Sequence, residues 1–195
     1  VVMGQSVLAA DKKPLTKEES AKVIEAAIRR AVNKPTGELT KTDYEKVTKL
    51  ILENNQLTSV KGLEKLTQLK DLSLRDNKLT DVKGLEKLTQ LKWLNLYKNK
   101  LTDVKGLEKL TQLMLLSLGN NQLTEVPKEL EKLTQLKGLY LSDNQLTDVK
   151  GLEKLNQLTW LYLTGNKLTD VKGLEKCTQL KTLRLPYNQL TDVKG

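Results

Sequence analysis

The chain has 195 residues and a formal net charge of +9, from 33 Lys and Arg against 24 Asp and Glu. It contains no His and a single Cys, Cys177, which excludes an intrachain disulfide, His-dependent catalysis and the usual Cys/His zinc sites. Acids and bases nearly balance in the repeated segments, so a concentrated basic face of the kind that binds nucleic acid is not expected.

The first residues, VVMGQSVLAADKK, look like the end of a signal peptide. An apolar stretch leads to the small residues of VLAA and then to charge at Asp11. We therefore expect residues 1–10 to be a signal-peptide remnant and the protein to be secreted, periplasmic or at the cell surface. The alternative is an irregular apolar tail that happens to end in two alanines. No stretch of the sequence is long and apolar enough to span a membrane.

A helical N-terminal cap is predicted for residues 11–46. In LTKEESAKVIEAAIRRAVNKP, Thr16 and Glu19 have the spacing of a capping box, and LTKTDYEKV repeats that device with Thr40 and Asp43. A solenoid would expose the leucines of its first repeat, so a lid with one polar side is needed there. The apolar stripe of the longer helix is expected to consist of Val23, Ile24, Ala27, Ile28 and Ala31.

Residues 47–195 repeat with a period of 22 residues. The pattern L-x-x-L-x-L-x-x-N-x-L, whose positions we number 1 to 11, appears as LKDLSLRDNKL from Leu69 and LKWLNLYKNKL from Leu91. Leucines at positions 4 and 6 alternate with other residues, as in a strand with one buried face, so each repeat is expected to add one parallel strand. Only stacking of repeats buries the leucines.

An asparagine at position 9 marks every repeat. It is expected to turn inward and to bond backbone groups of the turn that follows the strand. These residues are Asn55, Asn77, Asn99, Asn121, Asn144, Asn166 and Asn188. The spacing from Asn121 to Asn144 is 23, because Val126-Pro-Lys-Glu-Leu130 replaces VKGL. Pro127 favours a helical turn, so a more helical convex segment is expected in this repeat.

The cap, followed by repeats such as NQLTDVKGLEKLTQL, resembles the secreted bacterial leucine-rich-repeat proteins, the internalins among them. The resemblance covers residues 16–195. It implies an α/β solenoid: a horseshoe with a parallel concave sheet, short 3-10 or helical convex segments and an α-helical N-terminal cap. It also implies a non-enzymatic recognition scaffold, often exported and displayed at a surface. From the residue content, no cofactor or metal is expected. About seven repeats are expected, with an uncapped C-terminus that lacks the domain usually following internalin repeats.

The repeats differ mainly at positions 3, 5, 7 and 8, which are expected to face solvent on one side of the sheet. Both Trp and four of the five Tyr fall there, whereas the convex segments barely change. Exposed aromatic side chains are favoured as binding anchors, although strands also tolerate Trp and Tyr at solvent-facing positions. The predicted ligand-binding residues are Trp93, Tyr97, Leu115, Tyr140, Trp160, Tyr162, Arg184 and Tyr187.

The size of this face limits the ligand. Seven strands about 4.8 Å apart, with five exposed residues about 3.3 Å apart in each, cover roughly 500 Å². A stable protein interface takes about 800 Å² per partner, so a glycan, a peptide or a protruding protein loop fits best. The alternative is a structural or assembly protein that associates through its uncapped C-terminal end and has no dedicated concave ligand.

Lysines along the same face form a predicted basic rim. Its members are Lys70, Lys92, Lys98, Lys137 and Lys181. Two interpretations remain: the rim attracts an acidic glycan or anionic envelope component, or it is a solvated edge that keeps the exposed face soluble. Cys177 replaces a leucine of the other repeats and is expected to be a small buried hydrophobe.

Overall fold

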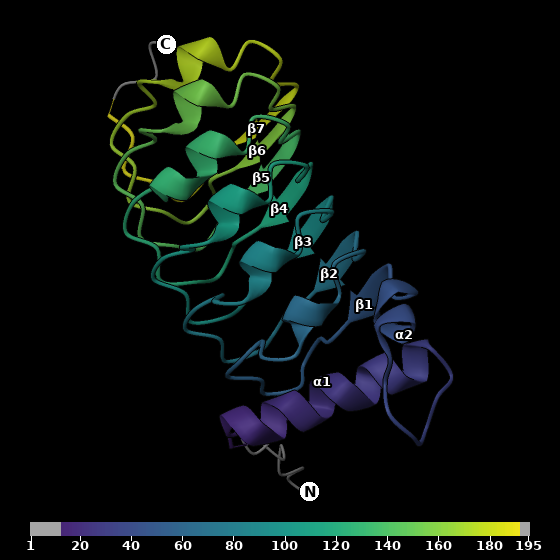
Figure 1. Ribbon diagram of the computed structural model, residues 1–195. Helices are drawn as coiled ribbons and strands as arrows, with labels where there is room; N and C mark the ends of the chain where they lie inside the picture. Colours follow the sequence, from purple (N-terminus) through teal and green to yellow (C-terminus); the bar gives the residue numbers. More distant parts are fainter. Residues whose placement is uncertain (1–12, 192–195) are drawn as a thin grey trace, which may run out of the picture.

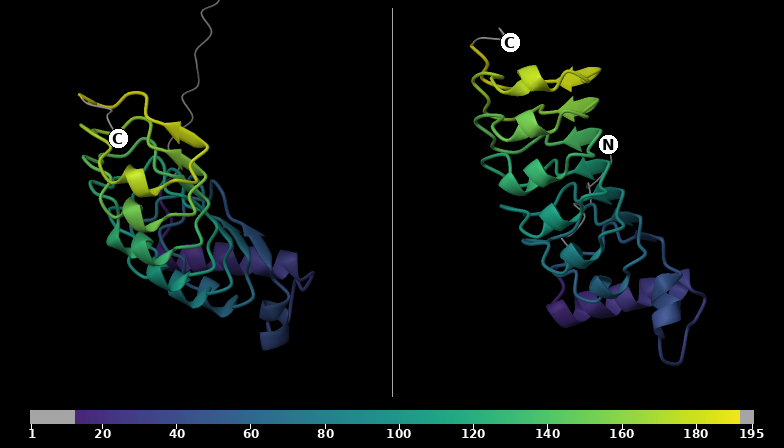
Figure 2. Two further views of the ribbon diagram at one scale, coloured as in Figure 1. Left: turned by 90° about the horizontal axis from the view of Figure 1, so that it is seen from above. Right: turned by 45° about the horizontal axis from the view of Figure 1, so that its top comes forward.

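The computed structural model describes residues 13–191, and the expected signal-peptide remnant lies outside this range (Figure 1). Two helices lead into a solenoid of seven coils, each of which adds one strand to a single sheet. The strands stack along one side of the molecule, whereas short 3-10 turns and loops stack along the other (Figures 1 and 2). The expected leucine-rich-repeat solenoid is confirmed.

Helix α1 (Lys17–Ala31) closes the first coil and lies across the end of the stack (Figure 2). Its capping box is present: the Glu19 N–H donates to Thr16 Oγ1 at 3.2 Å, and the Thr16 N–H donates to Glu19 Oε2 at 2.7 Å. The helix buries Ile24, Ala27 and Ile28 against the first coil. These contacts hide leucines that a preceding repeat would otherwise cover.

One residue of the cap differs from expectation, and another makes a buried polar contact. Ala31 is exposed, because the helix ends at this residue and its stripe no longer faces the first coil. Ser20 is buried instead, where its hydroxyl accepts the Thr58 N–H at 3.2 Å. A hydroxyl on the apolar side of the helix therefore satisfies a backbone group of the first coil.

Helix α2 (Lys41–Glu45) has the second expected capping box, formed by Thr40 and Asp43. Asp43 is nearly buried and also accepts a hydrogen bond from Lys34 Nζ at 2.7 Å. The Lys34 ammonium and the Thr40 N–H stabilise the carboxylate and hold the pKa of Asp43 well below its ordinary value. This cluster fixes the connection between the two helices of the cap.

The seven strands form one parallel sheet in the order of the sequence. They are β1 (Lys49–Ile51), β2 (Asp71–Ser73), β3 (Trp93–Asn95), β4 (Leu115–Ser117), β5 (Gly138–Tyr140), β6 (Trp160–Tyr162) and β7 (Thr182–Arg184). Every pair is in register, so equivalent motif positions lie side by side across the sheet. The central leucine of β1 to β6 faces the buried interior.

The opposite side of the solenoid, which we call the loop side, carries one 3-10 turn between each two successive strands. The turns are η1 (Leu63–Lys65), η2 (Leu85–Lys87), η3 (Leu107–Lys109), η4 (Lys128–Lys132), η5 (Leu152–Lys154) and η6 (Leu174–Lys176). Most follow a glycine with positive φ, as at Gly84 (φ 112°). In the 23-residue repeat, Pro127 stands immediately before η4, which has five residues rather than three and confirms the expected longer segment.

The repeated asparagines tie each coil to the one before it. In Asn99, Oδ1 accepts the Leu79 N–H at 3.0 Å, and Nδ2 donates to the carbonyls of Leu74 and Leu96 at 3.0 and 3.1 Å. The expected structural role is therefore confirmed. Asn55 differs: its Nδ2 donates to its own turn at Glu53, because the cap replaces the coil that it would otherwise reach.

Candidate functional site

The outward side chains of the strands form a continuous surface, which we call the sheet face. It comprises positions 3 and 5 of each strand and positions 7 and 8 just beyond it. In β3, Leu94 is buried while Trp93 and Asn95 on either side are only partly covered, and the other strands follow this alternation with a few exceptions. One exception is Ser73, which is buried and whose hydroxyl donates to Glu53 Oε1 at 2.6 Å.

Two tyrosines stack in the middle of the sheet face. Tyr140 and Tyr162 are paired in the register of β5 and β6, and their ring centroids lie 4.8 Å apart with planes inclined by 22°. Burial, and then the neighbouring Tyr162, raise the pKa of the Tyr140 phenol above its ordinary value. The Tyr140 phenol therefore remains a neutral hydrogen-bonding group at physiological pH.

Gly138 has no side chain, and neighbouring side chains pack over its backbone. A Cβ atom at this residue would lie 2.6 Å from Leu115 Cδ2, 3.4 Å from Tyr140 Cε2 and 3.5 Å from Trp160 Cε3. The backbone of Gly138 does not have a positive φ, so a side chain here would have to displace the end of Leu115 but would not strain the backbone. We call Leu115, Tyr140, Trp160 and Tyr162 the aromatic cluster. Gly138 itself was not predicted to belong to the site; the missing side chain between Leu115 and Trp160 was its only sequence signal.

Other predicted residues extend this cluster along the sheet. Trp93 pairs with Leu115 in the register of β3 and β4 and is partly buried. Arg184 pairs with Tyr162 and is exposed. Five neighbouring strands, β3 to β7, thus place predicted ligand-binding residues on one surface, with Trp160 the most exposed aromatic side chain in the cluster at 39%.

Two predicted tyrosines lie beyond the strand ends and outside the aromatic cluster. Tyr97 packs against the bare backbone of Gly119, and the Arg75 guanidinium lies 5.3 Å from the centre of its ring. Tyr187 is 85% exposed and has a φ of 58°. Position 8 has a positive φ in each of the seven coils, and only this coil places a bulky aromatic residue there.

The five lysines of the predicted basic rim do not lie together, which corrects that grouping. Four of them precede strands and are aligned at the N-terminal edge of the sheet; we call Lys70, Lys92, Lys137 and Lys181 the lysine row. Lys98 follows β3 and lies at the opposite edge, where its ammonium pairs with Asp76 Oδ2 at 2.9 Å. The 22-residue period showed which lysines were equivalent, but proximity in sequence to Trp93 and Tyr97 hid the edge to which Lys98 belongs.

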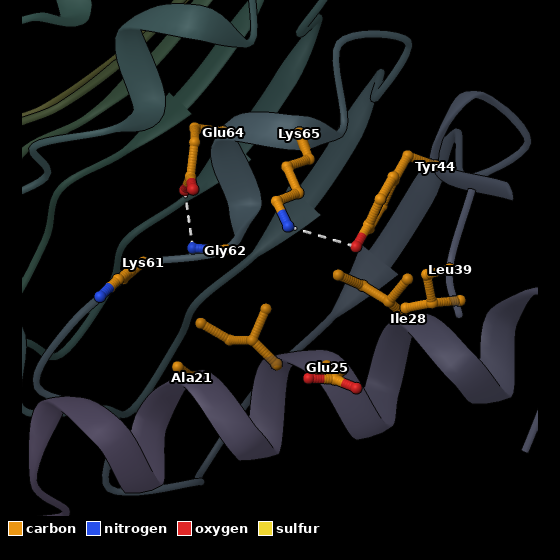
Figure 3. Close-up of a pocket in the computed structure, with 10 residues that line it drawn as sticks. Ala21, Glu25, Ile28, Leu39, Tyr44, Lys61, Gly62, Glu64 and Lys65 are labelled. Atoms are coloured by element: carbon orange, nitrogen blue, oxygen red, sulfur yellow. Dashed lines mark hydrogen bonds between the residues drawn. The ribbon is translucent and has the colours of Figure 1, made fainter. Parts of the chain in front are cut away.

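A groove of about 270 Å³ lies between α1 and the first coil (Figure 3). Its apolar lining includes Ile28, Leu39 and Tyr44, and the Lys65 ammonium lies 5.1 Å from the Tyr44 ring and 3.4 Å from its hydroxyl. None of the predicted ligand-binding residues lines this groove. This groove lies where the cap packs against the first coil, and it is separate from the sheet face.

The sheet face offers apolar area and hydrogen-bonding groups. Cys177 is buried as expected, and burial raises the pKa of its thiol. Within residues 13–191 no three His, Cys, Asp or Glu side chains are grouped so as to hold a metal ion. Exposed Trp and Tyr side chains with charged residues beside them suit the aromatic cluster to the binding of a ligand.

Comparison with known proteins agrees with this architecture. The leucine-rich-repeat pattern matches residues 111–168, and a pattern of two leucine-rich repeats matches residues 45–87, 89–130 and 156–195. A solved leucine-rich-repeat protein of Leptospira interrogans is 37% identical, with a TM-score of 0.75 over 80% of this chain and 42% of that one. The chain thus spans less than half of that protein.

A second solved protein, internalin C2 of Listeria monocytogenes, is 28% identical with a TM-score of 0.68. The similarity covers 88% of this chain and 86% of that one. No curated protein sequence matches the chain.

Proposed function

We propose that this chain, which belongs to the leucine-rich-repeat family, is a non-enzymatic recognition module that binds a protein loop, a peptide or a glycan on its sheet face. The family and the similarity to internalin C2 indicate a protein-interaction module. The position of the site and the class of ligand are our proposal.

The aromatic cluster is the observation that carries this proposal. Three neighbouring coils bring together a leucine, two stacked tyrosines and a tryptophan on a solvent-facing surface. Apolar area of this kind is costly to leave in water, and Trp and Tyr are enriched among the residues that dominate binding energies. The loop side, which is equally accessible, carries mostly Lys, Glu, Asp, Thr and Gln instead.

The test is a quadruple variant, Trp93→Ser, Tyr140→Ser, Trp160→Ser and Tyr162→Ser, probed beside the parent on a glycan array and a displayed peptide library. Because anchor residues each contribute 2 kcal/mol or more, we expect ligand capture to fall by more than about 100-fold. Circular dichroism should show the fold unchanged, since all four side chains face solvent. Tyr44→Ser, in the cap, is the matched control and should retain binding.

The competing assignment is an assembly protein that associates through its C-terminal end. If the quadruple variant still binds all that the parent binds, the sheet face is not the recognition surface, and the assembly role is favoured. Sedimentation of both proteins over a range of concentrations would then measure that association directly.

We also propose that the protein is exported, on the basis of the signal-like residues 1–10. Within residues 13–191, no helix combines the length and the apolar character needed to cross a membrane. Fractionation of the producing cells, followed by N-terminal sequencing of the recovered protein, tests export. A mature N-terminus close to Asp11 supports it, and an intact leader on a protein confined to the cytoplasm contradicts it.

A further inference from the structure

The lysine row has an uncompensated positive charge. Its four lysines are all exposed, and in residues 13–191 none of their ammonium groups lies within 4.0 Å of a carboxylate. The register of the parallel strands aligns them along one edge of the sheet face. This edge is therefore a line of free cations beside the aromatic cluster.

Some lysines of the loop side, unlike those of the lysine row, form ion pairs with carboxylates. Lys105 Nζ lies 3.5 Å from Asp103, Lys150 Nζ lies 3.7 Å from Asp148, and Lys154 pairs with Glu131 of the preceding coil. Rows of acidic residues run beside these lysines in every regular coil. Their charges are largely offset locally, so the loop side offers an anion much less net attraction than the lysine row does.

The spacing within the lysine row is regular over most of its length. Lys92, Lys137 and Lys181 precede β3, β5 and β7, which are alternate strands of the sheet. With strands about 4.8 Å apart, these lysines recur at intervals on the order of 10 Å. Met114 and Thr159 precede the strands between them.

Neighbouring residues define where an anion is favoured. Trp160, on β6, lies between the strands that follow Lys137 and Lys181, and it exposes 39% of its surface. At the other end, Asp71 directly follows Lys70 and is the only carboxylate at position 3 of the seven coils. Asp71 disfavours an anion beside Lys70, so the favourable stretch runs from β3 to β7.

We propose that a linear anionic polysaccharide lies along this edge, with its acidic groups on Lys92, Lys137 and Lys181 and a sugar ring on the indole of Trp160. A polysaccharide with one acidic group in every second sugar repeats its charge over a length comparable to the lysine spacing. An extended acidic peptide presents side chains on one side at intervals of about 7 Å, which matches the row less well. The C–H face of a sugar ring also suits the negative face of an indole.

This inference deepens the proposed recognition role, because it assigns a ligand class to one edge of the same face. The test measures binding of hyaluronan and unsulfated chondroitin by isothermal titration calorimetry at 50 and 200 mM NaCl. The row variant is Lys92→Gln, Lys137→Gln and Lys181→Gln. The matched control, Lys87→Gln, Lys109→Gln and Lys176→Gln, removes the same charge from exposed positions of the loop side.

We expect the row variant to bind both polysaccharides at least 10-fold more weakly at 50 mM NaCl, and the control to remain within about twofold of the parent. Parent binding should weaken with salt, and the row variant should show a smaller salt dependence because fewer counterions are released. Lys70→Gln should change affinity by less than twofold. Trp160→Ser should weaken binding to both polysaccharides, whereas neutral dextran should not bind any form.

Three results would overturn the proposal. Equal losses in the row variant and the control would mean that net charge alone attracts the polymer. Binding of poly-L-glutamate as tightly as the polysaccharides would exclude a glycan-specific site, and no polysaccharide binding by the parent would remove the site altogether. The Tyr140→Ser, Tyr162→Ser double variant separates the two proposals, since it should lose ligands of the aromatic cluster and keep the polysaccharide.

Discussion

The inward and outward sides of each strand differ in how much they vary from coil to coil. The central, inward residue is leucine in all seven strands, whereas the outward residue at position 5 is Ile, Ser, Asn, Ser, Tyr, Tyr or Arg in turn. From β2 to β6, an inward leucine packs between the leucines of two neighbouring coils, and both coils restrict which side chain fits there. An outward side chain has neighbours only to the sides, and it is free to serve a ligand.

The strongest test of this difference is one substitution on each side of the same strand. Leu116→Ala removes a fully buried side chain of β4 and leaves a cavity, so the free energy of unfolding should fall by about 4 kcal/mol. Leu115→Ala, one residue earlier on the sheet face, should cost about 1 kcal/mol. Urea denaturation of both variants measures the difference. Similar losses would mean that the aromatic cluster is part of the core.

A second prediction concerns the polar part of the interior. Asn121→Ala leaves the Leu101 N–H and the carbonyls of Leu96 and Leu118 without their side-chain partner, so we expect a loss of roughly 3 kcal/mol. Gln122→Ala, at the exposed neighbouring position, should stay within about 0.5 kcal/mol of the parent. Equal thermal stability of the two variants would contradict the structural role of the asparagines.

The third and smallest effect compares glycines of the two surfaces. Gly84→Ala on the loop side forces a side chain into a backbone with a φ of 112°, which should cost about 1 to 2 kcal/mol. Gly138→Ala should leave stability nearly unchanged, because its backbone suits alanine and the flexible end of Leu115 can move. The same change should alter the emission of Trp160, measured in a Trp93→Phe background. Unaltered emission would show that Gly138 does not support the aromatic cluster.

Most of the fold followed from the spacing of leucines and asparagines, because each coil repeats the same contacts with its neighbour. The capping boxes at Thr16 and Thr40, the turn lengthened after Pro127 and the burial of Cys177 all had local signals. The prediction that Ala31 belongs to the buried apolar stripe was wrong, because an amphipathic pattern does not fix the residue at which a helix leaves the surface that it covers.

The site was predicted as a surface but not as a set of contacts. The period placed Tyr140 beside Tyr162, yet the stacking of their rings and the fold of Leu115 over Gly138 depend on side-chain rotamers, which spacing does not encode. Lys98 was grouped with the lysine row although it follows its strand, whereas the lysines of the row precede theirs. The three residues of β3 separate the two edges of the sheet, and the ion pair of Lys98 with Asp76 lies at the edge opposite the lysine row.

The asparagine bonds have a consequence for how such a molecule changes over evolution. Most of them join residues 3, 20 or 25 apart, and the one irregular coil merely lengthens two of these separations to 21 and 26. Unequal recombination that inserts or deletes a whole unit therefore leaves every remaining bond with its proper partner. A lineage can lengthen or shorten its recognition surface in single genetic steps, without first having to invent a new interior.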